Sequence, residues 1–87
     1  MKGMPKIVDV KPLDDMNLMV TFDNNIIKNY DVKRLLDKYS VFEELRQKNI
    51  FNLVHVECGG YGIAWTDEID LSGYEIWDHG QLNNSGS

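Results

Sequence analysis

The sequence contains a single cysteine, Cys58, among its 87 residues. One cysteine excludes an intramolecular disulfide and a cysteine-rich zinc site, because both need more than one thiolate. A chain without disulfides suits a reducing compartment, and we expect the cytoplasm. We expect the Cys58 thiol to be buried and inert, since free cysteine usually packs as a small apolar side chain.

Long apolar runs are also missing, and none approaches the roughly 20 residues that a helix needs to cross a bilayer. The stretch from Met1 to Lys6 carries charge, but no apolar segment follows it, so the pattern is not that of a signal peptide. A chain of 87 residues is enough for one domain with a modest core. We therefore expect a single domain over residues 1–80, a disordered polar tail over residues 81–87, and no association with membranes.

Positive charge is scarce. Nine Lys and Arg residues oppose fourteen Asp and Glu residues, which gives a formal net charge of −5, and only Lys33 and Arg34 are adjacent basic residues. Binding to phosphates needs clustered basic side chains, so we expect no direct binding to nucleic acid. The acidic balance favours a basic protein partner that is attracted by charge. Solubility alone is a simpler explanation of the same charge.

Three segments of the first thirty residues read as strands. Residues 17–23 alternate with a period of two, with Leu18, Val20 and Phe22 on one face, which is typical of a half-buried strand. Residues 6–12 are rich in strand-forming residues, and residues 26–30 return as a third strand. Asn24 and Asn25 tolerate the left-handed backbone that a tight hairpin needs. The pattern predicts a three-stranded antiparallel meander.

The period then becomes helical. Residues 31–39 place apolar side chains at the spacing of one helical face, with Asp31 as the predicted N-cap. Ser40 and Glu43 have the spacing of a capping box, which predicts a second short helix that ends near Lys48.

The last third returns to strands. Residues 52–58 and 63–66 predict a hairpin around the glycine-rich turn at residues 59–62. Ser72 and Glu75 again have the spacing of a capping box and predict a short final helix. The predicted order is βββ-αα-ββ-α, an α+β fold in which an antiparallel sheet, made of the meander and the C-terminal hairpin, packs against two or three short helices.

The sequence shows no recognisable catalytic motif. His55 and Cys58 are the nearest pair of a candidate base and nucleophile, but residues three apart in a strand point to opposite faces. The glycine-rich turn leads into another strand, whereas phosphate-binding loops lead into a helix. We therefore predict no catalytic, cofactor-binding or metal-binding residues, and we expect that the protein is not an enzyme.

The densest group of carboxylates is Asp67, Glu68 and Asp70. It lacks the spacing of a calcium-binding loop, so it either stabilises a turn or contacts a partner protein. Among the aromatic residues, we expect Trp65 in the core, and Tyr61, on a loop, is the better candidate for an interface. The predicted partner-binding residues are Tyr61, Asp67, Glu68 and Asp70.

The final third also carries a recognisable signature. It is the stretch IAWTDEIDL at residues 63–71, followed by Tyr74 and Trp77. Shorter matches precede it in the same order, at Phe22-Asp23, Tyr30-Asp31-Val32, Leu35-Leu36, Phe42-Glu43-Glu44-Leu45, Phe51 and Val54. Over residues 7–78 the chain thus resembles the bacterial domain of unknown function 2442 family.

The resemblance implies a small α+β domain. Some relatives carry an added helix-turn-helix segment, and some are encoded beside a small toxin-like protein. The resemblance thus implies, as an expectation, an antitoxin-like or regulatory member of a two-protein system, with a basic, toxin-like partner. It departs from the family pattern at Asn24-Asn25, where a glycine usually follows the aspartate. We also expect no DNA-binding extension after Trp77, which argues against autonomous DNA regulation.

The leading hypothesis is therefore a small cytoplasmic protein-binding domain without a cofactor. The alternative is a structural, homo-oligomeric accessory domain, such as a homodimer, whose sheet edge pairs with itself. A small-molecule sensor or a hydrolase, with a pocket between sheet and helices, is a third hypothesis.

Overall fold

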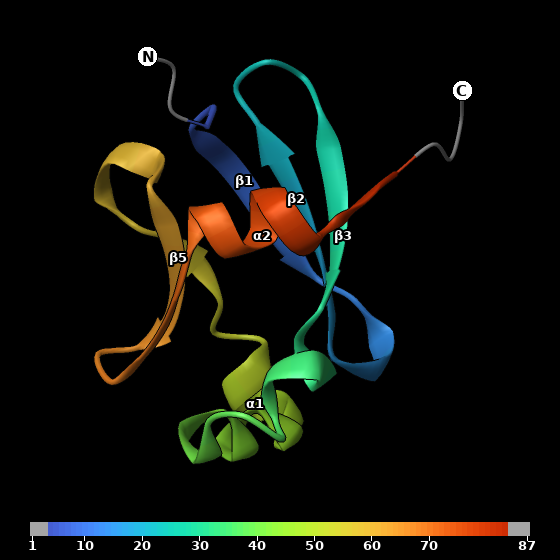
Figure 1. Cartoon of the computed structure of the whole chain (residues 1–87). Coiled ribbons are helices and arrows are strands. Elements are labelled where there is room, and N and C mark those ends of the chain that lie inside the picture. Colours follow the sequence, from blue (N-terminus) through green and yellow to red (C-terminus); the bar gives the residue numbers. More distant parts are fainter. Residues whose placement is uncertain (1–3, 84–87) are drawn as a thin grey trace.

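The computed structural model describes residues 4–83 and contains two antiparallel sheets with short helices between and beside them (Figure 1). The first sheet has the order β1-β2-β3-β7. Its strands are β1 (Ile7–Pro12), β2 (Asn17–Phe22), β3 (Ile27–Asp31) and β7 (Gln81–Leu82). The α+β fold class that the sequence predicts is confirmed, but the meander and the C-terminal hairpin form two separate sheets rather than the single sheet predicted.

The predicted meander of the first three strands is also confirmed. In β2, Leu18, Val20 and Phe22 are buried and the residues between them are less so, as the period of two predicts. The turn between β2 and β3 holds Asn25 at a φ of 72°, a left-handed conformation that asparagine adopts more readily than most residues. A 3₁₀ helix, η1 (Asp14–Met16), links β1 to β2.

The second sheet consists of β4 (His55–Val56), β5 (Gly62–Thr66) and β6 (Ile69–Ser72), in the order β4-β5-β6. The predicted pairing around the glycine-rich turn is confirmed by the β4–β5 ladder. The strand β6 is an addition to the prediction, in which the stretch around Asp67 and Asp70 is at most a turn.

The strand β4 is shorter than predicted, because the chain turns after it into a 3₁₀ helix, η4 (Cys58–Gly60). Gly59 and Gly60 have φ values of 87° and 77°, which an extended strand does not allow. A Cβ atom on Gly60 would lie 2.6 Å from the Ile7 carbonyl oxygen, so the close approach to β1 also requires glycine.

The helical segment in the middle of the chain is mostly 3₁₀ rather than α. It comprises η2 (Val32–Leu35), η3 (Ser40–Arg46) and a single α-helical turn, α1 (Lys48–Phe51). Asp31 caps η2 as predicted, with its Oδ1 accepting from the Lys33 amide at 2.9 Å. The predicted cap at Ser40 is wrong, since η3 begins without a side-chain hydrogen bond.

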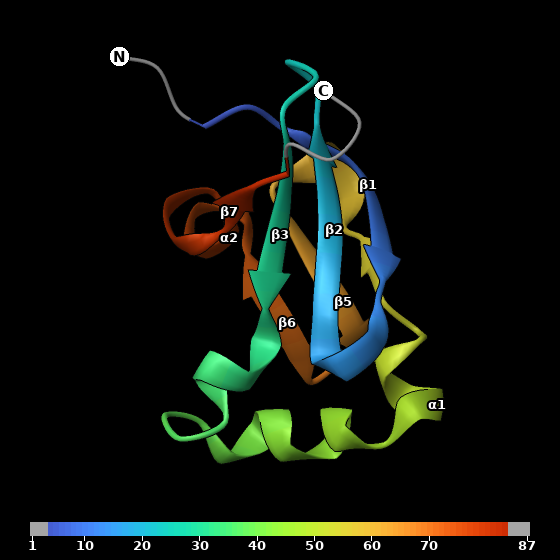
Figure 2. The same ribbon diagram turned by 90° about the vertical axis from the view of Figure 1, so that its right-hand side faces the viewer.

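The apolar faces of both sheets meet in one core. Figure 2 shows β5 and β6 behind the first sheet, with η3 and α1 below both sheets and α2 (Gly73–His79) at one side. Trp65 is 2 % exposed, which confirms its predicted place in the core. Its ring centroid lies 6.2 Å from those of Phe42 and Phe51, so the tryptophan packs the second sheet against the helical segment.

The C-terminal end differs from the prediction of a disordered tail over residues 81–87. Gln81 pairs with Asn29 and Leu82 with Lys28, so β7 extends the first sheet. The reason is that α2 ends against β3, and at Gly80 a Cβ atom would lie 3.2 Å from the Cβ of Lys28. The chain therefore continues along β3, while residues 84–87 lie outside the described part.

Within residues 4–83, no helix combines the length and the apolar character that crossing a membrane requires.

The two predicted capping serines allow a matched test of local stability. The Ser72 Oγ accepts from the Tyr74 amide at 3.1 Å, whereas Ser40 makes no such bond. We expect Ser72→Ala to lower the free energy of unfolding by about 1 kcal/mol, and Ser40→Ala by less than about 0.5 kcal/mol. Urea denaturation followed by circular dichroism measures both. Equal losses would contradict the assignment of the caps.

Candidate functional site

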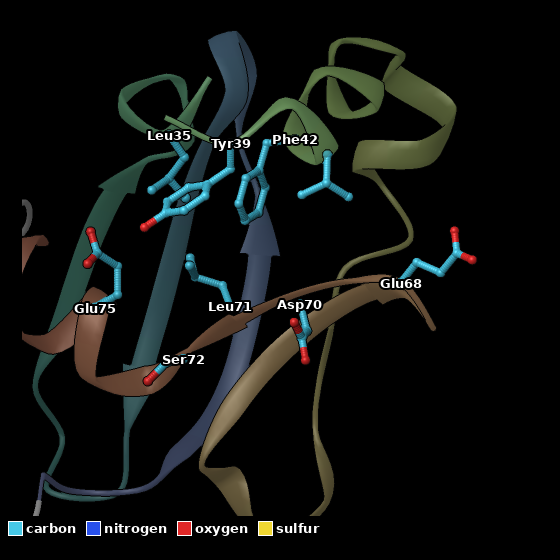
Figure 3. Close-up of a pocket in the computed structure, with 9 residues that line it drawn as sticks. Leu35, Tyr39, Phe42, Glu68, Asp70, Leu71, Ser72 and Glu75 are labelled. Atoms are coloured by element: carbon cyan, nitrogen blue, oxygen red, sulfur yellow. The ribbon is translucent and has the colours of Figure 1, made fainter. Parts of the chain in front are cut away.

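A groove of about 370 Å³ lies between β6 and the 3₁₀ helices η2 and η3 (Figure 3). One wall comes from the helical segment and is apolar, with Leu35, Tyr39, Val41 and Phe42. The other wall comes from β6, its preceding turn and α2, with Glu68, Asp70, Leu71, Ser72 and Glu75. The groove therefore joins an apolar surface to a row of carboxylates.

The apolar wall is partly exposed and rests on the core. Tyr39 is 56 % and Val41 is 40 % exposed, whereas Phe42 is buried. The Phe42 ring lies edge-on to Tyr39, with centroids 6.1 Å apart, and edge-on to Trp65 on its other side. This stack fixes the position of the wall, so that it offers a preformed apolar surface.

Glu75 is held by the fold. Its Oε2 accepts a hydrogen bond of 2.8 Å from the buried Tyr30 hydroxyl. The Arg34 Nε lies 3.7 Å from the same oxygen, and the His79 Nε2 lies 3.9 Å from Oε1. Glu75 therefore ties α2 to β3 and is partly neutralised by its neighbours.

Glu68 and Asp70 differ from Glu75. Both side chains are exposed, and neither forms an ion pair with any residue of the described range 4–83. The groove is lined by three carboxylates and by no Lys or Arg side chain. Two of these negative charges are therefore free to attract a cation.

The structure brings together only part of the predicted partner-binding set. Glu68 and Asp70 line the groove, whereas Asp67 lies in the turn between β5 and β6 and does not line it. Tyr61 is 63 % exposed and lies just before β5, with the Lys6 Nζ 5.4 Å from its ring centroid. It lines a second hollow of about 300 Å³, which meets the groove at Asp70, Leu71 and Ser72.

Cys58 is exposed, so the prediction of a buried thiol is wrong. The prediction assumed that the strand continues through residue 58, but the chain has already entered the η4 turn there. Cys58 lines the second hollow, and His55 does not. The His55 Nδ1 lies 3.0 Å from the Leu53 carbonyl oxygen.

Sequence reasoning missed the apolar wall of the groove. The sequence places Tyr39 on the apolar face of a helix over residues 31–39, but η2 ends at Leu35 and Tyr39 is exposed. The early end of the helix turns Tyr39 away from the core. The sequence marks Glu75 only as the partner of Ser72 in a capping box, whereas its carboxylate accepts from Tyr30 in a distant strand, a contact with no local signal.

A polar hollow of about 420 Å³ bears on the hypothesis of a small-molecule sensor. It is lined by Asn17, Asn29, Asp31, Arg34, His79 and Gln81. Its basic groups, Arg34 and His79, both lie beside Glu75, so their charge is partly compensated within the fold.

Among residues 4–83, no group of three or more His, Cys, Asp or Glu side chains is arranged to hold a metal ion.

The fold and the groove define a small α+β domain with an acidic, partly apolar surface groove. The chain belongs to the family described as protein of unknown function (DUF2442), whose sequence model matches residues 7–81. No significant match was found among curated proteins or among solved structures.

The hydrogen bond from Tyr30 to Glu75 predicts a loss of stability at alkaline pH. Burial, and then the bond to Glu75, raise the pKa of Tyr30 above its ordinary value. The stabilisation is therefore complete below about pH 10, where an unfolded tyrosine ionises, and is lost as the pH rises further, by about 1.4 kcal/mol per pH unit.

We expect the free energy of unfolding of Tyr30→Phe to fall less steeply than that of the native protein above about pH 10, as measured by urea denaturation at each pH. Tyr74→Phe removes an exposed tyrosine without this bond and should retain the steep fall. Native and Tyr30→Phe proteins with the same pH profile would contradict the account.

Proposed function

We propose that this protein is an interaction domain that binds a basic segment of a partner protein in the groove beside β6, without performing chemistry. The observation that carries the proposal is the pairing of an exposed apolar wall with the unpaired carboxylates of Glu68 and Asp70. Lys and Arg side chains fit such a surface, because their apolar stems pack on aromatic rings while their charged heads reach carboxylates.

Charge complementarity selects this occupant over the alternatives. Three carboxylates line the groove, so it would repel the phosphates of nucleic acid. The net charge of −5 would attract a basic protein over a longer range and speed its association.

A second copy of the chain fits less well. It would bring a groove with the same carboxylates, and like charges at an interface oppose association. The homo-oligomeric alternative is tested by the molecular mass in dilute solution, where we expect a monomer.

The antitoxin-like role implied by the family resemblance is one form of this function. In that role the domain covers a basic surface of its partner and so prevents the partner from acting. The groove needs only a short basic and apolar segment, so a regulatory partner of another kind would bind in the same way.

Binding of a simple basic peptide tests the proposal. The probe is an acetylated, amidated hexapeptide of alternating lysine and valine, labelled for fluorescence anisotropy. We expect saturable binding that weakens with added salt, because exposed charges are screened within about 10 Å at 0.1 M ionic strength.

The double variant Glu68→Gln and Asp70→Asn should weaken binding about tenfold, which corresponds to about 1.4 kcal/mol. The control is Asp9→Asn with Asp23→Asn, which removes the same charge from exposed carboxylates outside the groove. We expect the control to change affinity less than about twofold. An equal loss of peptide affinity in the two double variants, or no binding of the peptide to the native protein, would contradict the proposal.

A further inference from the structure

The outer edge of β6 carries unpaired backbone groups. The Gly73 amide donates to the Tyr61 carbonyl at 2.9 Å, and the register continues with Gly62 opposite Ser72 and Ile63 opposite Leu71. In an antiparallel pair, hydrogen-bonded and non-hydrogen-bonded positions alternate. The backbone groups of Leu71 therefore face β5, whereas those of Asp70 and Ser72 face away from it.

No strand among the described residues 4–83 pairs with this edge, because β6 is the last strand of the order β4-β5-β6. Within the same range, the amides of Asp70 and Ser72 have no hydrogen-bond acceptor. The groove lies along this edge, since Glu68, Asp70 and Ser72 all line it. The free donors and acceptor therefore face the space where the proposed partner binds.

We infer that the partner segment binds as an added antiparallel strand on the outer edge of β6, an inference that rests on the proposed function. The hydrogen bonds form with the amide and carbonyl groups of Asp70 and with the amide of Ser72. Strand addition to an open sheet edge is a general mode of peptide recognition, in which the backbone supplies affinity and alternate side chains supply specificity.

The two sides of β6 dictate the sequence of the added strand. Leu71 lies opposite the buried Ile63 and, as Figure 3 shows, points toward Tyr39 and Phe42. Asp70 lies opposite Ala64 and is exposed on the other face. Side chains of the added strand alternate in the same way. In the added strand, side chains on the same face as Leu71 are expected to be apolar, and side chains on the same face as Asp70 are expected to be basic.

The same geometry argues against pairing of β6 with β6 of a second copy. A two-fold antiparallel pair centred on this edge brings the Asp70 carboxylates of both copies close together, and like charges across a strand pair are destabilising. A cationic strand has the opposite effect. The edge is also only four residues long, so the side-chain contacts are needed for affinity as well as specificity.

The alternation predicts which peptide amides point at β6. The residue opposite Asp70 forms the hydrogen-bonded pair, and its side chain lies on the same face as Asp70. In the hexapeptide of alternating lysine and valine, the lysine amides therefore point at β6 and the valine amides point away. Two isomeric peptides test this, one N-methylated on its lysine amides and the other on its valine amides.

With the native protein, we expect methylation of the lysine amides to weaken binding at least about tenfold, and methylation of the valine amides less than about twofold. Equal binding of both isomers overturns strand addition but leaves the proposed function standing, because the unmodified peptide still binds. Stronger loss from methylated valines overturns the antiparallel register. Failure of the unmodified peptide to bind overturns the proposed function itself.

Discussion

The hydrogen bond between the Tyr30 hydroxyl and the Glu75 carboxylate ties α2 to β3, and Glu75 is the residue that α2 contributes to the groove. Tyr30 belongs to the first sheet, and Glu75 lies in α2, the helix that directly follows β6 of the second sheet. The helix is held further by Trp77, whose ring packs edge-on against Phe22 with centroids 4.9 Å apart. Because α2 leaves the second sheet at Ser72 and runs to β3, it carries the chain away from the outer edge of β6.

The elements that could be predicted from the sequence are those specified by local pattern. Leu18, Val20 and Phe22 identify β2 through strict alternation, and Asp31 and Ser72 identify helix starts through their side-chain oxygens. The strand β6 was not predicted, because Ile69–Ser72 is only four residues long and becomes a strand by pairing with β5. The same holds for β7, whose two residues depend on β3.

The site shows the same division. Glu68 and Asp70 could be selected from the density of charge in the sequence. Asp67 and Tyr61 were selected on equally local grounds, but neither lines the groove. A carboxylate lines the groove only if its position along β6 brings it next to the helical segment that forms the other wall. Val41 joins them across a gap of more than twenty-five positions in the chain, a relation that no local pattern encodes.

Amide hydrogen exchange at Asp70 and Leu71, followed by NMR, tests most directly the claim that the outer edge of β6 is open and is where a partner binds. Leu71 faces β5, so its amide should exchange slowly with or without ligand, whereas the Asp70 amide should exchange rapidly in the free protein. Saturation with the peptide of alternating lysine and valine should then slow exchange at Asp70. An Asp70 amide already protected in the free protein, or equally rapid with the peptide bound, would contradict the claim.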